Sequence, residues 1–386
     1  MFISKDDKKL IDRLSEIEKI NSWEKSFEKE HGIAPYNISS WNVSKSFRES
    51  LRYQLDWPQL GDEIDYIYTY SLGRGLKEKI INKILEHQDS NSTIIITPNN
   101  TISIVNIAKF LKSYGYHNVC ILNPSYFSVS QTFQTMDISY QIVNLIRQDG
   151  DYILPLEKIL TQNFDAVWLT SPVYSTGVYF SDKEFTKIQF LIDSGVMVIA
   201  DESFALNGYE LIRHILPGKH FIGIYSPHKA ICCNGIKFSA IITSDEYEDF
   251  FEQWVDVLSG NLPQSSIIAA HHFVTDNYDN CNIFFQTKTN SIRTNILNYT
   301  QELPKEIDRN SAGNLMTLYF KHIPYMDTIN YDFCTSLFRK TFSSFYPGFL
   351  NGFGRDIGFC FRINLALDSP DFFQATYKVI LYLINN

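Results

Sequence analysis

The sequence predicts an α/β fold in which a mostly parallel β-sheet lies between two layers of helices, followed by a smaller α+β domain. Between residues 93 and 225, short apolar runs alternate with segments whose apolar side chains recur at helical spacing. This alternation is typical of parallel strands, because each crossover to the next parallel strand is usually a helix. After residue 303 strands and helices become fewer, which favours a separate small domain. At 386 residues the chain is long enough for two unequal domains.

The first 50 residues are expected to form a helix and an arm that pack with the small domain. Residues 5–31 carry apolar side chains at helical spacing, which predicts an amphipathic helix rather than a disordered tail. Residues 33–62 are aromatic and contain two prolines, which favours an irregular arm. A loop at residues 68–75 and a helix at residues 76–87 are expected to follow.

The large domain is expected to span residues 51–285. Runs rich in Ile, Val and Leu predict its strands, and apolar residues three or four positions apart predict its helices. The predicted strands cover residues 93–97, 118–122, 138–145, 165–170, 196–200 and 221–225. The predicted helices cover residues 102–114, 128–136, 156–160 and 183–194.

The small domain is expected to span residues 286–386. A helical stretch at residues 264–303 is long enough to bridge the two domains. Beyond it, the pattern predicts strands at residues 315–320 and 357–365 and helices at residues 332–341 and 371–384.

Composition and charge exclude several functional classes. The net charge of −9 argues against a nucleic-acid partner held by phosphate neutralisation. The six cysteines show no CxxC pair and no metal-ligand spacing, so we expect no metal site and free thiols in a reducing compartment. The chain starts without an apolar signal core, and no window reaches membrane-spanning length. A cytoplasmic protein that does not bind membranes is therefore expected.

Two residues at strand ends carry the first functional signal. Asp201 ends the apolar run 196–200, and Lys229 follows the run 221–225. Open α/β sheets bind ligands at the carboxyl ends of their strands, so we expect the carboxylate and the amine to face one crevice. An enzyme that uses pyridoxal phosphate needs such a pair, a lysine to hold the aldehyde as a Schiff base and an acid to keep the pyridine nitrogen protonated. A solvated loop lysine and a helix cap explain the same two residues without a cofactor.

Further motifs stand in a fixed order around this pair. They are Tyr68-Thr69-Tyr70-Ser71-Leu72-Gly73, Pro98-Asn99-Asn100-Thr101, Asn123-Pro124-Ser125-Tyr126, Pro172-Val173-Tyr174-Ser175-Thr176-Gly177, Asp201-Glu202-Ser203-Phe204, Ser226-Pro227-His228-Lys229, Asn234-Gly235-Ile236-Lys237 and Gly358-Phe359-Cys360-Phe361-Arg362. This series resembles the class I/II aminotransferase family, the fold-type I pyridoxal phosphate enzymes. The resemblance implies a seven-stranded, mostly parallel sheet sandwiched by helices, amino acid and keto acid substrates, and a homodimer with shared active sites.

The resemblance also implies a role for each candidate residue. Lys229 would carry the Schiff base, Asp201 would pair with the pyridine nitrogen, and the Tyr126 ring would stack on the pyridine face. Arg362 would hold the substrate carboxylate in two parallel hydrogen bonds. The phosphate would be bound by Asn99, Asn100, Thr101, Ser226 and Lys237, and by Tyr68 from the neighbouring subunit. Helix capping at residues 99–101, core packing of the two tyrosines and an ion pair at Arg362 are the alternatives without a ligand.

The chain departs from the family pattern around the cofactor. Asn99 replaces a glycine, and we expect the turn to survive because Asn tolerates left-handed backbone angles. Tyr174 replaces an asparagine and Phe204 a tyrosine, so both usual donors to the cofactor 3-oxygen are changed, and Tyr174 is the candidate substitute donor. Lys237 replaces an arginine and can neutralise phosphate only as a point charge. His228, beside Lys229, is either structural or catalytic.

Three functions are consistent with these residues. The first is a pyridoxal phosphate-dependent aminotransferase that acts on an α-amino acid. The second keeps the cofactor but eliminates from, cyclises or oxidises an amino acid in a specialised biosynthetic pathway, which the changed pocket positions favour. The third is a non-catalytic relative with a binding role. Retention of Lys229, Asp201 and Arg362 argues against the third.

Overall fold

A sheet of seven strands forms the centre of the fold, with the order β2-β10-β9-β8-β7-β3-β4. The computed structural model describes residues 5–52, 91–213, 215, 218–235, 237–260, 266, 269–271 and 273–386, and the structural statements below concern these residues. All strands of the sheet are parallel except β10, which runs antiparallel to both of its neighbours. The strands are β2 (Ser92–Thr97), β3 (Val119–Asn123), β4 (Tyr140–Asn144), β7 (Ala166–Thr170), β8 (Met197–Glu202), β9 (Phe221–Tyr225) and β10 (Ser239–Ser244). The prediction of a mostly parallel α/β sheet is therefore confirmed.

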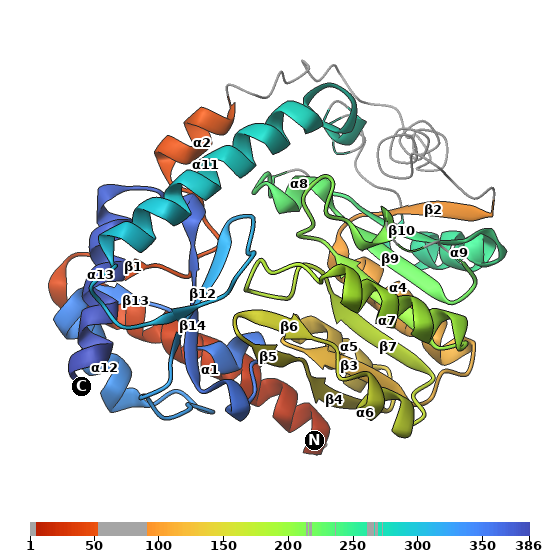
Figure 1. Cartoon of the computed structure of the whole chain (residues 1–386), viewed down its shortest axis with the longest axis horizontal. Coiled ribbons are helices and arrows are strands. Elements are labelled where there is room, and N and C mark those ends of the chain that lie inside the picture. The colour runs from red at the N-terminus through yellow and green to blue at the C-terminus, as the bar shows by residue number, and fades with distance from the viewer. Residues whose placement is uncertain are drawn as a thin grey trace.

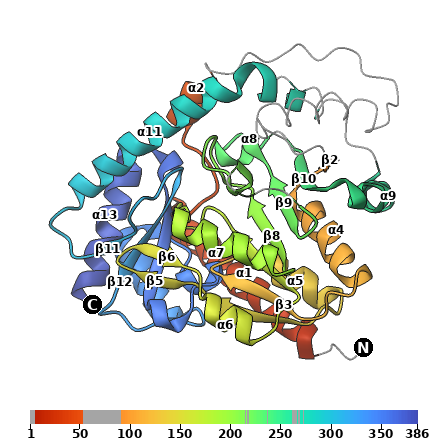
Figure 2. The same ribbon diagram turned by 45° about the vertical axis from the view of Figure 1, so that its right-hand side comes forward.

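Helices cover both faces of this sheet, which is why its strands are apolar runs rather than alternating ones. In β8, Val198 and Ala200 belong to one hydrophobic cluster, whereas Met197 and Ile199 belong to the other. One face carries α4 (Asn100–Ser113), α5 (Phe127–Thr135) and α9 (Glu248–Ser259), and the other carries α6 (Leu156–Thr161) and α7 (Asp182–Asp193). Figures 1 and 2 show α7 in front of the sheet and α4 and α5 behind it.

The C-terminal part is built on a three-stranded antiparallel sheet of β11 (Glu306–Ile307), β12 (Leu315–Phe320) and β14 (Phe359–Asn364). Its helices are α12 (Tyr331–Thr341) and α13 (Pro370–Asn385), and the long helix α11 (Tyr278–Tyr299) runs beside α13 (Figure 1). A short hairpin of β5 (Ile146–Gln148) and β6 (Asp151–Ile153) lies between the two sheets. Single helical turns occur at η1 (Leu211–Arg213), η2 (Asp245–Tyr247), η3 (Phe273–Asn277), η4 (Gly348–Asn351), η5 (Arg355–Ile357) and η6 (Leu365–Leu367).

The N-terminal segment packs against this C-terminal part. In α1 (Lys5–His31), the indole of Trp23 meets the ring of Tyr331 edge-on, with centroids 4.3 Å apart. The short strand β1 (Tyr36–Asn37) pairs in parallel with β13 (Ser343–Ser344). The helix α2 (Lys45–Arg52) lies beside α11, where Phe47 is buried against Phe285 (Figures 1 and 2). The division of the chain at residues 50 and 285 stays a prediction.

Several elements differ from the sequence prediction. Residues 45–52 form α2 rather than an irregular arm, because Phe47 and Leu51, one turn apart, give this polar helix a buried edge. The strand β10, the helix α9 and the β5–β6 hairpin were not predicted. The loop at residues 68–75, the helix at residues 76–87 and parts of the stretches 33–62 and 264–303 lie outside the described residues. In the described part of the chain, no helix combines the length and the apolar character needed to span a bilayer.

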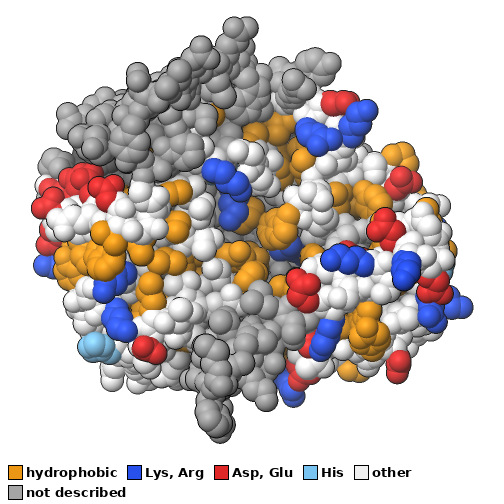
Figure 3. Space-filling model, turned by 180° about the vertical axis from the view of Figure 1, so that it is seen from behind, with side chains coloured by type: hydrophobic (Ala, Val, Ile, Leu, Met, Phe, Trp, Pro, Cys, Tyr) orange, Lys and Arg blue, Asp and Glu red, His pale blue; other side chains and the backbone are white. Residues whose placement is uncertain are grey.

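Charged side chains of both signs are interspersed on the described part of the rear face, seen at the right of Figure 3. A depression near the middle of this face has hydrophobic side chains at its rim and Lys or Arg side chains within it.

Candidate active site

A cavity of about 780 Å³ lies where the carboxyl ends of the central strands meet the C-terminal part and the N-terminal arm. The turn after β2, the ends of β7 and β8, and the helix α8 (Pro227–Ala230) after β9 supply one wall. Strand β14, η4, α1 and the arm after β1 supply the other. Of the predicted site residues, ten line it: Asn99, Asn100, Thr101, Tyr126, Tyr174, Asp201, Phe204, Lys229, Lys237 and Arg362.

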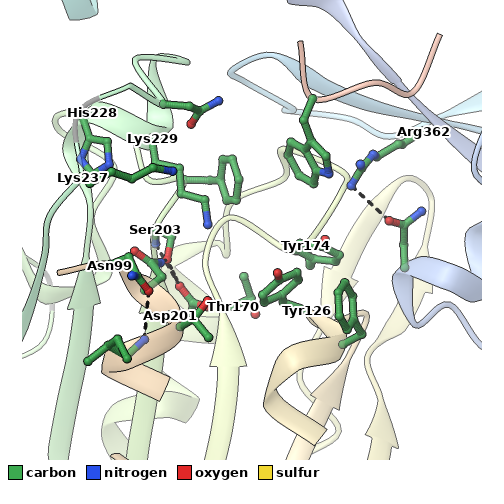
Figure 4. Close-up of a pocket in the computed structure, with 18 of the residues that line it drawn as sticks. Asn99, Tyr126, Thr170, Tyr174, Asp201, Ser203, His228, Lys229, Lys237 and Arg362 are labelled. Atoms are coloured by element: carbon green, nitrogen blue, oxygen red, sulfur yellow. Dashed lines mark hydrogen bonds between the residues drawn. The ribbon is translucent and has the colours of Figure 1, made fainter. Parts of the chain in front are cut away.

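Lys229 projects from α8 into this cavity, and Figure 4 shows its side chain directed toward the wall that carries Asp201. Its Nζ lies 4.9 Å from the ring centroid of Phe204 and 5.8 Å from that of Tyr126. Burial lowers the pKa of the Lys229 amine, and the nearby Asp201 carboxylate opposes this shift. The lysine is therefore deprotonated more readily than one in solution, which is the state in which an amine is a nucleophile.

Asp201 stands near the end of β8, in register with Thr170 of β7 and Ile224 of β9, and is 4% exposed. Its Oδ1 accepts hydrogen bonds from the backbone N–H of Ser203, at 3.1 Å, and from the Ser203 hydroxyl. Burial raises the pKa of Asp201, whereas Lys229 and Ser203 lower it. A buried carboxylate is stable as an anion only beside donors or a cation, so this side of the cavity suits a cationic group.

A chain of hydrogen bonds extends from Asp201 behind the cavity wall. The Asn100 side chain donates to the Ser203 hydroxyl and accepts from the Ser226 hydroxyl. The Ser226 hydroxyl is also 3.0 Å from that of Ser239 in β10. Ser226 is fully buried and is absent from the described lining of the cavity. Asn100 and Ser226 thus bond to each other rather than projecting freely into the space predicted for a phosphate.

The turn before α4 has a different conformation from the one expected. Asn99 has an extended backbone, with φ −174° and ψ 168°, so the prediction of a left-handed residue was wrong. Its side chain accepts a hydrogen bond from the backbone N–H of Ile102 and caps α4. Glycine is not needed at an extended position, which explains why asparagine is accommodated here. The N–H groups of Asn100 and Thr101 begin the helix, where the helix dipole favours an anion.

The Tyr126 and Tyr174 rings stand together on the floor of the cavity, with centroids 5.9 Å apart (Figure 4). Burial raises the pKa of Tyr126 to about 12. Burial also raises the pKa of Tyr174, while the charge of Arg362 and a hydrogen bond with it lower that pKa. The Tyr174 phenol, expected at the cofactor 3-oxygen, therefore lies within the field of the Arg362 charge.

Arg362 lies in β14 at the opposite side of the cavity from Lys229 and is 2% exposed (Figure 4). Its Nη1 donates to Asn351 Oδ1 at 3.2 Å, and its Nη2 donates to the Ser39 carbonyl at 3.4 Å. Its Nε has no hydrogen-bond partner, and no carboxylate of the described residues forms an ion pair with it. Burial lowers the pKa of this guanidinium. A buried cation without an anionic partner is costly, so the site favours an anionic ligand.

Lys237 and His228 lie at the α8 end of the cavity. Lys237 is exposed, as expected of a residue that binds phosphate as a point charge. His228 is 5% exposed, and its ring centroid lies 4.8 Å from that of Phe238. Burial and the charges of Lys229 and Lys237 lower the pKa of His228 to about 3, so its imidazole is neutral.

Some lining residues were not identified from the sequence, namely Ile17, Trp41, Thr170, Ser203, Tyr346, Leu350 and Asn351. Trp41 is the most prominent of them: its ring stacks on Phe204 with centroids 5.6 Å apart, and the Arg362 guanidinium lies 3.8 Å from its centroid. The aromatic composition of the arm was the only sequence signal for it. Tyr68, predicted to reach a neighbouring subunit, lies outside the described residues.

Comparison with solved structures finds close likeness of fold over nearly the whole chain. An aspartate aminotransferase from Thermotoga maritima superposes with a TM-score of 0.74 and 14% identity, covering 100% of both chains. An N-succinyldiaminopimelate aminotransferase from Mycobacterium tuberculosis gives a TM-score of 0.73 and 15% identity, covering 93% of this chain and 96% of that one. A pyridoxal phosphate-bound C-S lyase from Staphylococcus hominis gives 0.70 and 14%, covering 92% and 93%.

Sequence comparison adds no closer relative, since no family model and no curated protein matches. The likeness is therefore one of architecture, and the expectation of this architecture from the motif order is confirmed. The chain has the fold of the fold-type I pyridoxal phosphate-dependent enzymes, to which these aminotransferases and the C-S lyase belong.

Proposed function

We propose that this protein is a pyridoxal phosphate-dependent aminotransferase that acts on an α-amino acid and a keto acid. The observation that carries the proposal is one cavity with Lys229 and the buried Asp201 on one side and the buried, carboxylate-free Arg362 on the other. An amine, a carboxylate and a guanidinium so arranged suit an aldehyde, a cationic ring and a substrate carboxylate respectively.

The residues present fit the cofactor. Asp201 is a buried carboxylate whose only cationic neighbour is Lys229 in the described pocket, so it can pair with a protonated pyridine nitrogen. The start of α4 at Asn100 and Thr101, together with the exposed Lys237, would hold the phosphate. Tyr126 would lie against the ring. When bound, the cofactor supplies an electron sink for the bond that breaks at the substrate α-carbon.

The protein's own groups would bind the substrate and move its proton. Arg362, with two parallel N–H donors, would orient the α-carboxylate across the cavity from Lys229. The Lys229 amine, with a lowered pKa, would accept the α-proton and return it to another carbon as general base and acid. Trp41 above Arg362 and Phe204 near Lys229 would exclude water from the reacting atoms.

The proposal includes a homodimer whose subunits share active sites, with Tyr68 reaching the partner's cofactor phosphate. It places the protein in the cytoplasm, which agrees with six cysteines of which none forms a disulfide. It involves neither nucleic acid nor membrane partners.

The visible absorption spectrum of the purified protein, supplied with pyridoxal phosphate, tests the cofactor assignment. A band of lysine-bound cofactor that Lys229→Ala removes and Lys219→Ala retains would support it, because Lys219 is an exposed lysine outside the cavity. Conversion of this band by an amino acid, with release of its keto acid, would support transamination. A protein that takes up no cofactor would instead be the non-catalytic relative.

A second candidate function is elimination, cyclisation or oxidation of an amino acid with the same cofactor. Two substitutions favour it: Phe204 carries no hydroxyl, and Tyr174, whose pKa burial raises and the charge of Arg362 lowers, stands where the family has an asparagine. Both usual donors to the cofactor 3-oxygen are thus changed, and one of the fold neighbours is a C-S lyase. Product analysis separates elimination from transamination, because elimination releases the leaving group and, after hydrolysis by water, ammonia and a keto acid that lacks this group, without a keto acid acceptor.

A further inference from the structure

We infer that the substrate's side chain is apolar and that Trp41, with Ile17, Tyr346 and Leu350, forms its binding pocket. The inference rests on the proposed function, because it takes Arg362 as the ligand of the α-carboxylate. It adds the class of substrate, amino acids with large apolar or aromatic side chains, and a specificity-determining residue in the N-terminal arm.

The charged side chains of the cavity limit which substrate side chains it can bind. Among the described lining residues the charged side chains are Asp201, Lys229, Lys237 and Arg362, and His228 is neutral. Three of them lie at the α8 side, where the cofactor is proposed, and Arg362 alone is free for the substrate. No cation of the described lining is left for a second carboxylate, so the described residues of this subunit offer a dicarboxylic amino acid no partner for its second anion.

The wall of the cavity beyond Arg362 is mostly apolar. Ile17 from α1, Trp41 from the arm, and Tyr346 and Leu350 from the segment before β14 line it with apolar surface. Besides the Tyr346 hydroxyl, the polar side chain of this wall is that of Asn351, which is bonded to Arg362 and whose Nδ2 has no hydrogen-bond partner in the described structure. That donor would serve the same carboxylate as Arg362. An apolar side chain is therefore what the remaining surface favours.

Trp41 is held in place to form this wall. The Ser39 hydroxyl donates to the Arg362 carbonyl at 2.6 Å, and Asn364 Nδ2 donates to the carbonyl of Ser40 at 2.8 Å and to that of Asn42 at 3.0 Å. These bonds fix the arm to β14 on both sides of Trp41. The Trp41 indole covers one face of the Arg362 guanidinium. The edge of the guanidinium that would bind a carboxylate therefore lies beside an aromatic surface. Trp41 is thus a positioning residue for Arg362 and a wall of the side-chain pocket.

Calorimetric binding of two unreactive acids to the cofactor-loaded protein tests the inference without requiring turnover. 3-Phenylpropionate, with one carboxylate and an aromatic end, is expected to bind at least about tenfold more tightly than succinate, with two carboxylates. Equal or tighter binding of succinate, or binding of neither acid, would overturn the inference. The proposed transamination fails separately, if no amino acid converts the cofactor band while the acids still bind with the expected preference.

Variants of the wall make the test specific. Ile17→Arg, at a half-exposed position of α1, places a cation in the pocket and is expected to reduce the preference for 3-phenylpropionate by about tenfold. Trp41→Ala is expected to weaken the binding of 3-phenylpropionate by about tenfold. Trp41→Phe is expected to weaken this binding by less, because the phenyl ring keeps an aromatic surface over Arg362. Phe190→Ala, a half-exposed aromatic outside the cavity, is the matched control. An unchanged acid preference in both Ile17→Arg and Trp41→Ala would contradict the assigned pocket.

Discussion

At the scale of single residues, burial determines which protonation state each charged group of the cavity prefers. The amine of Lys229 and the imidazole of His228 have lowered pKa values, and the carboxyl of Asp201 has a raised one. The three share a desolvated space, and the carboxylate of Asp201 offsets part of the shift of Lys229. His228 has no such partner among the described residues, since its Nδ1 makes no hydrogen bond.

His228 is expected to make the protein sensitive to acid. Its folded-state pKa of about 3 lies below the unfolded value of about 6.5, so the unfolded state binds more protons between these limits. The free energy of unfolding therefore falls as the pH falls below about 6.5, by about 1.4 kcal/mol for this group between about pH 7.5 and about pH 5.5. Urea unfolding at both pH values should show a smaller decrease for His228→Asn than for the wild type. An equal decrease would mean that the imidazole is protonated in the folded protein.

Arg362 provides a second prediction at this scale. Arg362→Lys is expected to weaken binding of 3-phenylpropionate by about 10- to 100-fold, because an ammonium group cannot form two parallel hydrogen bonds or stack flat on Trp41. Calorimetry measures the change. Arg355→Lys is the control, since Arg355 is exposed and pairs with Asp327 outside the cavity. A similar loss in both variants would assign carboxylate binding elsewhere.

Sequence and structure agree to different degrees at the residue scale. The order of motifs was enough to place Lys229, Asp201 and Tyr126 in one cavity, because strand ends of a parallel sheet share an edge. Arg362 reaches the same cavity from β14 of the C-terminal sheet, and only the family resemblance predicted this. The wrong expectation at Asn99 arose from treating a substituted glycine as a left-handed position, whereas a capping side chain serves an extended one. Trp41 could not be placed, since its contact with Arg362 joins distant parts of the chain.

At the scale of elements, the loop after β7 is held by one glycine. Gly177 has φ +74°, and its carbonyl accepts a hydrogen bond from the backbone N–H of Ala312 at 2.8 Å. A Cβ at Gly177 would stand 2.3 Å from the Ala312 carbonyl oxygen. The glycine therefore allows the loop that carries Tyr174 to dock against the segment before β12.

Gly177→Ala is expected to lower the free energy of unfolding by about 2 kcal/mol or more, because it adds a steric clash to a strained backbone conformation. Gly195→Ala separates the two causes: Gly195 has φ +85° but nothing within 4 Å of its Cβ position. That control should lose only about 1 kcal/mol. Denaturant unfolding measures both, and equal losses would exclude the contact with Ala312 as the cause.

The helices and strands that were predicted correctly from the sequence are mostly the buried ones. The buried parallel strands and the longer helices were found from apolar periodicity, because both faces of the sheet are covered. Two of the elements that were missed are short or polar: α2 has two buried apolar side chains, and the β5–β6 hairpin has three residues in each strand. The other two, the helix α9 of 12 residues and the fully buried strand β10, are neither, and β10 is antiparallel in an otherwise parallel sheet. Local pattern alone does not specify the direction of a strand.

At the scale of the whole molecule, a buried ion pair connects the β5–β6 hairpin to the C-terminal sheet. Arg147 Nε donates to Asp308 Oδ1 at 2.8 Å, and the Tyr319 hydroxyl donates to Asp308 Oδ2 at 2.6 Å. The Arg147 guanidinium also lies 3.7 Å from the Tyr319 ring centroid. These contacts join the β5–β6 hairpin to the strands of the C-terminal sheet.

Asp308→Ala is expected to lower the free energy of unfolding by about 3 kcal/mol or more, because it leaves Arg147 buried with only Glu306 as a partly exposed partner. Lys321→Ala breaks the exposed Lys321–Glu306 pair in the same sheet and should cost less than about 1 kcal/mol. Urea unfolding of the two variants compares buried and exposed pairs directly. A loss at Asp308 no larger than at Lys321 would mean that water reaches Arg147.

The attachment of the arm to β14 has a consequence for synthesis. The hydrogen bond from Ser39 to Arg362 spans 323 positions, so the arm leaves the ribosome on the order of tens of seconds before the strand it needs, at roughly 5–20 residues per second. The strands that carry Asp201 and precede Lys229 emerge well before Arg362. A nascent chain can therefore assemble the amine and the carboxylate early, but the Arg362 guanidinium emerges last, and only then can the indole of Trp41 cover it. A chain can therefore bind a carboxylate at this site only after β14 has been synthesised.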